Sequence, residues 1–158
     1  MKTIVALAAA GALLAGSSAY AQTEPLTFTI TGSWSEVAFT GGLGPEGMAA
    51  RAGNVDGTFQ AVLSNGDVVN GTAHCVGMNQ HPSQIFALII SCDTTSATGD
   101  NTVAWLLGCN PATDIAEGSY ACVGGFQGKA GLSEGTRGSM TMFFDGQGGS
   151  RGVGQWLN

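Results

Sequence analysis

The sequence predicts an all-β protein: a single antiparallel eight-stranded up-and-down β-barrel with two disulfides. Short segments with apolar residues at every second position follow one another, separated by turn sequences about every 8–15 residues. Charged residues make up only 10% of the chain, and 26 of its 158 residues are glycine, which favours strands and tight turns over long helices. Four cysteines follow an export signal, and this pattern is typical of a protein with structural disulfides.

The export signal occupies the first 21 residues. Lys2 precedes an apolar run from Ile4 to Ala15, and Ala19-Tyr20-Ala21 matches an A-x-A cleavage site. The run has about 12 residues, fewer than the roughly 20 that a membrane-spanning helix needs. We therefore expect residues 1–21 to be a signal peptide and residues 22–158 to be a periplasmic or secreted barrel domain without a membrane span.

The first strand is expected directly after the signal peptide. Residues 26–31 alternate large apolar side chains with threonine, which is the period-two pattern of a strand with one apolar face. Alternation resumes at Trp34, after a glycine at Gly32 where a bulge would turn the following side chains to the opposite face. The register at Gly32 therefore decides whether Glu36 shares the apolar face or points outward.

A long loop and a hairpin are expected next. Residues 41–57 contain six glycines and no sustained period, so they are interpreted as a loop with a short helical turn at residues 48–51. Strands are predicted at residues 58–63 and 68–77, because Asn65-Gly66 between them favours a type I′ hairpin turn.

The second half of the chain supplies the remaining strands. Residues 85–92 are almost uninterruptedly apolar, which predicts a strand buried on both faces. Turn sequences, among them Asn110-Pro111, separate the strands that follow. These strands are predicted at residues 102–109, 119–123, 138–144 and 152–157.

The four cysteines are expected to form two disulfides. If consecutive strands are antiparallel neighbours, Cys75 meets Cys92 and Cys109 meets Cys122, although a Cys92–Cys109 pairing stays open. The spacings contain no C-x-x-C unit, so neither a zinc site nor a catalytic dithiol is expected. Each bridge would stabilise the fold by about 2–4 kcal/mol.

Charge and motifs exclude several classes of function. The chain has a formal net charge of −6, and Arg51, Lys129, Arg137 and Arg151 are scattered, so no basic surface for nucleic acid is expected. The chain also contains no G-x-S-x-G, H-E-x-x-H, Walker A or Rossmann pattern. We therefore expect neither a cofactor nor a metal, and the sequence does not predict the oligomeric state.

Two segments carry a resemblance to a known family. Residues 123–136, Val-Gly-Gly-Phe-Gln-Gly-Lys-Ala-Gly-Leu-Ser-Glu-Gly-Thr, resemble the glycine-rich segment GGTGK(F/Y)xGxxG of allene oxide cyclase-like and dirigent-like barrels. Residues 91–103 are similar to the cysteine, acidic turn and strand that precede this segment in small secreted bacterial relatives. Gly32-Ser33-Trp34 also matches the G-x-W of the first strand in lipocalins and other calycins. The resemblance implies a calycin-like eight-stranded barrel in a family that includes a plant cyclase, dirigent proteins and bacterial proteins of unknown role.

Glu36 is the candidate catalytic residue. A carboxylate on an apolar strand face would have a raised pKa and could act as a general acid or base. The alternative is a bulge at Gly32 that turns Glu36 to solvent, where acids are far more often found.

Large apolar side chains are the candidate ligand-binding residues. An eight-stranded barrel is just wide enough to hold one small ligand, so these side chains either line a cavity or fill it as core. The candidates are Trp34, Phe86, Trp105, Tyr120, Met140 and Met142.

The histidines offer a weaker site. His74 shares a face with polar residues, which is either the solvent face or a polar barrel lining. His74, Met78 and His81 are suitable copper ligands, but their spacing fits no known copper site.

Three functions are consistent with these observations. The first is binding of a small apolar or aromatic molecule inside the barrel, which requires a cavity with a few polar groups. The second is a cofactor-free isomerase or cyclase of the allene oxide cyclase-like kind, which requires an ionisable residue facing inward. The third is a protein-interaction role, for instance as a secreted protease inhibitor, which should leave an exposed apolar surface near one set of loops.

Overall fold

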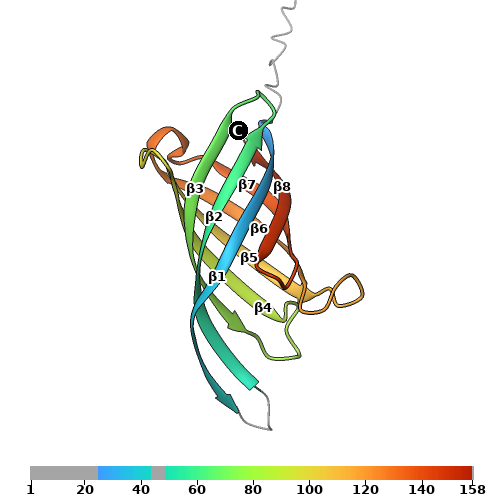
Figure 1. Ribbon diagram of the computed structural model, residues 1–158. Helices are drawn as coiled ribbons and strands as arrows, with labels where there is room; N and C mark the ends of the chain where they lie inside the picture. The colour runs from blue at the N-terminus through green and yellow to red at the C-terminus, as the bar shows by residue number, and fades with distance from the viewer. Residues whose placement is uncertain (1–24, 44–48, 158) are drawn as a thin grey trace, which may run out of the picture.

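The structure is a computed structural model that describes residues 25–43 and 49–157. Eight antiparallel strands close into one barrel in chain order (Figure 1). This arrangement confirms the predicted fold class. The strands are β1 (Thr27–Leu43), β2 (Ala49–Leu63), β3 (Val68–Asn79), β4 (Leu88–Ser96), β5 (Thr102–Pro111), β6 (Tyr120–Ala130), β7 (Arg137–Phe144) and β8 (Gly149–Leu157), with a 3-10 turn, η2 (Gly131–Ser133), before β7.

The expected signal peptide lies outside the described residues. Within the described ranges, no helix has the length and apolarity needed to cross a membrane.

The two disulfides join neighbouring strands, as favoured from the cysteine positions. Cys75 on β3 is bonded to Cys92 on β4, and Cys109 on β5 is bonded to Cys122 on β6. In each pair the cysteines are direct cross-strand partners, so the up-and-down strand order brings them together. The open alternative, Cys92–Cys109, is therefore wrong. Two disulfides are consistent with an oxidising compartment such as the periplasm or the cell exterior.

The expected glycine-rich loop is wrong where the structure describes it. β1 continues to Leu43 and β2 begins at Ala49, so residues 49–57 form a strand and residues 49–51 are not helical. The glycines in this stretch do not break the strands, because at least one of them accommodates a ring. A Cβ at Gly57 would lie less than 3.0 Å from the ring of Trp34.

Two details of the strands also differ from expectation. The bulge in β1 lies between Glu36 and Ala38, and the pairing with β2 runs through Gly32 without a shift. The strand expected at residues 85–92 begins only at Leu88, and its side chains alternate between exposed and buried from Ser91 to Thr94. It therefore has one face in the core and one face on the outer surface of the barrel.

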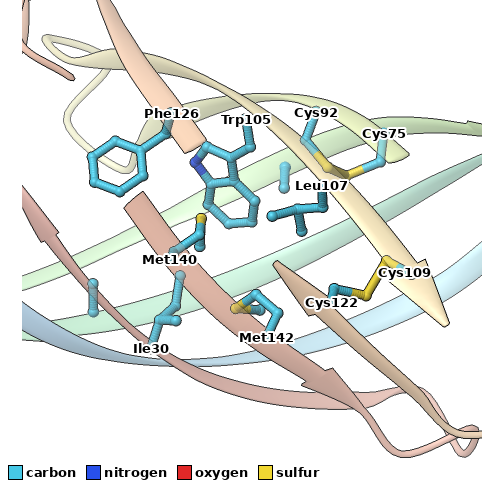
Figure 2. Close-up of a cluster of buried hydrophobic side chains, with 12 residues drawn as sticks. Ile30, Cys75, Cys92, Trp105, Leu107, Cys109, Cys122, Phe126, Met140 and Met142 are labelled. Carbon is cyan, nitrogen blue, oxygen red and sulfur yellow. A yellow bond between two sulfur atoms is a disulfide. The ribbon is translucent and has the colours of Figure 1, made fainter. Parts of the chain in front are cut away.

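The inside of the barrel is filled by side chains from every strand (Figure 2). Trp105 and Leu107 on β5 meet Met140 and Met142 on β7 near the centre, with Ile30 of β1 beside them. Glycines on neighbouring strands provide the room that large side chains need. Those with less than 3.0 Å between an added Cβ and a large side chain of the core are Gly57, Gly71, Gly138, Gly152 and Gly154.

The β7–β8 turn is held by a carboxylate. Oδ1 of Asp145 accepts hydrogen bonds from the backbone N–H groups of Gln147, at 2.7 Å, and Gly149, at 2.9 Å. These two bonds, with a smaller contribution from the charge of Arg151, lower the pKa of Asp145 below its ordinary value of 3.8. The ionised form of Asp145 therefore favours the folded state.

We predict that the stability of the turn depends on pH in a defined direction. Because the folded-state pKa is lowered, the stabilisation is present above the ordinary pKa and is lost as the pH falls through the folded-state pKa. Asp145→Asn should therefore be less stable than the native chain at neutral pH, and the difference should shrink in acid. Urea unfolding at both pH values measures this, with Asp114→Asn as a control in the β5–β6 connection. A difference that is independent of pH would contradict the assignment.

Candidate functional site

The structure brings five of the six candidate ligand-binding residues into one cluster. Trp105, Met140 and Met142 are buried, and Trp34 and Tyr120 are partly buried against the same core. Phe86 is the exception, because it lies in the connection before β4. Its ring covers Gly108. Because Leu107 and Cys109 face inward, Gly108 between them faces the outside of the barrel, and the Phe86 ring therefore lies on the outer side.

The rings of the cluster contact one another rather than enclose a space. Trp34 lies edge-on to Trp105, with ring centroids 6.5 Å apart, and its ring centroid is 5.7 Å from that of Phe144. Toward the other end of the barrel, Phe126 packs edge-on against Phe28 at 5.5 Å and Trp156 at 4.5 Å. Edge-to-face packing at these distances is favourable, so the rings form a well-packed core.

The polar groups inside the described barrel are few and paired. Nε1 of Trp34 donates to Oγ of Ser150 at 2.7 Å, and Oγ1 of Thr94 donates to the carbonyl oxygen of Val103 at 2.8 Å. No buried side-chain nitrogen or oxygen in the described residues lacks a partner. The buried polar residues in this part of the chain are serines and threonines, so none supplies an acid or a base.

Glu36 occupies a defined backbone position. It pairs with Val55 of β2, two residues beyond Trp34 and before the bulge. Because the register is continuous from Phe28, Glu36 falls in the same alternation as Ile30 and Trp34. Its side chain is outside the described part of the structure, and its catalytic role stays a prediction.

His74 lies on the outer surface of the barrel. It contacts Asp56 on β2, and its cross-strand partner on β4 is Asp93, which binds Nζ of Lys129 at 2.6 Å. Asp56, His74 and Asp93 form an exposed polar row across β2, β3 and β4, and Lys129 of β6 reaches its β4 end. In the described residues, no three His, Cys, Asp or Glu side chains are placed to hold a metal ion.

The β1–β2 hairpin projects beyond the barrel (Figure 1). β8 pairs with β1 only from Thr27 to Ser33, and β3 pairs with β2 only from Ala52 onward. We call the part beyond these limits the β1–β2 arm, formed by Ser35–Leu43 of β1 and Ala49–Arg51 of β2.

An open groove lies at the base of the arm. It has a volume of about 610 Å³ and contains no charged side chain. Ala38 and Thr40 of the arm line one side, and Val76 and Met78 of β3 with Ile89 of β4 line the other. The sequence does not predict this groove, because the six glycines of residues 41–57 hide the strand pattern. Alternation of small residues at 38, 40, 50 and 52 was the available signal.

Fold and surface together define a class: an eight-stranded up-and-down barrel with a filled interior, two cross-strand disulfides and one projecting hairpin. No family model matches the chain, and no curated protein or solved structure matches it. The resemblance to allene oxide cyclase-like barrels stays a prediction.

Proposed function

We propose that this chain is an exported protein-interaction module that binds a protein partner at the arm end of the barrel. In this proposal the barrel is a rigid scaffold and the outer surface does the binding. The observation that carries the proposal is the filled interior, because a ligand on the barrel axis would have to displace packed rings.

The surface beside the arm supports the proposal. Val76 and Met78 on β3 are more than half exposed, and so is Leu106 on β5. Ser91 of β4 pairs with both Val76 and Leu106, so these side chains lie on adjacent strands of one outer face. Exposed apolar side chains that are grouped on one face often mark a protein-interaction site.

The arm end also carries apolar side chains in its loops. Ile85, in the β3–β4 connection, is 84% exposed, and Ile115, in the β5–β6 connection, is 64% exposed. In an up-and-down barrel these two connections lie at the same end as the β1–β2 hairpin. An exposed apolar surface near one set of loops is the feature expected of a protein with a protein-interaction role.

Native mass spectrometry of residues 22–158, purified from the exported fraction, tests the proposal. We expect only masses that the polypeptide itself accounts for, as one copy or two, and no ligand bound after incubation with a library of small apolar compounds. A stoichiometric bound small molecule would overturn the proposal. It would favour ligand binding inside the barrel. If Glu36→Gln then abolished conversion of that molecule without weakening its binding, the result would favour an enzyme.

A further inference from the structure

The closed barrel leaves a long edge of β1 open in the arm, among the described residues. The backbone N–H of Trp34 donates to the carbonyl oxygen of Gly148 at 2.7 Å, and this is the end of the contact between β1 and the β8 side. From Ser35 onward, β1 is paired only with β2. Beyond the bulge, Ala38–Leu43 therefore presents a row of backbone donors and acceptors that no other described strand uses.

The composition of this edge does not block pairing. Exposed edges in natural proteins usually carry lysine, proline or inward charges that prevent another strand from adding. Ala38–Leu43 contains none of these, and the bulge that precedes it leaves six residues of regular strand. Gly41 and Gly42 also present no side chain to an approaching backbone.

We propose that two copies of this chain pair antiparallel through the Ala38–Leu43 edge of β1, related by a two-fold axis. The inference rests on the proposed function, because it names the partner as a second copy. The product is a four-stranded sheet in the order β2–β1–β1–β2 that links two closed barrels. A strand edge matches its own copy in antiparallel orientation, since each offers the same alternating donors and acceptors.

Charge favours a second copy at this place over other places on the surface. With a net charge of −6, two copies repel one another over most of their surfaces. Ala38–Leu43 and the groove beside it carry no charge, so like charges do not face each other across the axis. Ala38 and Thr40 belong both to this edge and to the groove. In the dimer, the grooves of the two copies would therefore be continuous on the outer face of the joined sheet.

Hydrogen exchange measured against protein concentration tests the pairing. We expect the amides of residues 38–43 to exchange more slowly as the concentration of the mature chain rises, while those of β5 and β6 do not change. Analytical ultracentrifugation of the same samples should show a reversible dimer.

A matched pair of lysine substitutions tests the place of contact. Thr40→Lys puts a charge at the edge, and we expect the dissociation constant of the dimer to rise about tenfold or more. Thr31→Lys makes the same change at an exposed position in the part of β1 that is paired with both β2 and β8. We expect it to change the dissociation constant by less than about twofold. Equal effects of the two substitutions would overturn the assignment to this edge.

Two results would overturn the pairing itself. One is a chain that stays monomeric up to about 1 mM, where even a weak dimer would form, with concentration-independent exchange at residues 38–43. The other is protection of these amides only when a different exported protein is added, which would replace the second copy as partner and leave the proposed function standing. The proposed function fails separately, when native mass spectrometry shows a bound small molecule.

Discussion

Gly138→Ala is expected to lower the free energy of unfolding by about 3 kcal/mol, because this position has no room for a methyl group. A Cβ on Gly138 would lie less than 3.0 Å from both the Phe126 ring and the backbone oxygen of Gln155. The ring cannot move aside freely, since it packs edge-on against Phe28 and Trp156. The added atom therefore forces a shift of both the aromatic core and the β7–β8 pairing.

Gly77→Ala is the matched control. A Cβ on Gly77 of β3 would have its nearest neighbour, Cδ1 of Leu88, at 3.5 Å, which is ordinary van der Waals contact. Alanine should be neutral or should stabilise by up to about 1 kcal/mol, because it reduces the freedom of the unfolded chain. Urea unfolding of both variants gives the comparison. Equal free energies of unfolding for the two variants would show that the Phe126 ring does not prevent a larger side chain at position 138.

Removing the β5–β6 disulfide is expected to have an effect of similar size. Cys109 and Cys122 are 13 positions apart, and replacing both with alanine should cost about 3 kcal/mol through the greater freedom of the unfolded chain. The β3–β4 disulfide closes a separation of 17, so loop entropy predicts nearly the same cost for its removal. Any larger difference between the two double variants would have to come from packing around the cysteines.

Chemical unfolding with and without a reductant measures this effect. All four cysteines are at most 5% exposed, so the folded protein should resist a thiol reductant until it unfolds. The double variant of Cys109 and Cys122 should unfold at lower urea concentration than the native chain under oxidising conditions. If the reduced native chain were as stable as the oxidised one, the disulfides would have no part in holding the barrel together.

The strands and disulfides were predictable wherever alternation was interrupted by recognisable turns. Asn65-Gly66 marked the β2–β3 turn, in which Gly66 has a φ of 93° that glycine adopts without strain. Strand order along the chain then placed Cys75 beside Cys92 and Cys109 beside Cys122.

The rest could not be predicted, because glycine has two opposite meanings in this chain. In turns it provides a backbone conformation, whereas at Gly57 and Gly138 it provides space beneath a ring from another strand. To distinguish these two roles, one must know which ring from another strand lies against the glycine. A single sequence does not contain that information. For this reason the glycines of residues 41–57 predict a loop, and the sequence gives no indication of the arm or its groove.

The candidate residues were predictable as a group but not in their role. Trp34, Trp105, Met140 and Met142 are large apolar residues of predicted strands, and the structure brings them together. Whether such side chains line a cavity or fill it depends on the radius of the barrel and on the neighbouring glycines, which alternation does not report. Phe86 lies outside this cluster because β4 begins at Leu88, two residues beyond Phe86.

The pairing of β1 with β8 has a consequence for how the protein is made. All other pairings join strands that are neighbours in the chain, so they can form one after another as hairpins. The seam between β1 and β8 joins the first strand to the last, so it cannot form before the final residues are available. Until β8 is available, the strands that have formed can make only an open sheet with two unpaired edges and an exposed apolar face. Closure of the barrel by β8 is therefore expected to compete with aggregation through these edges.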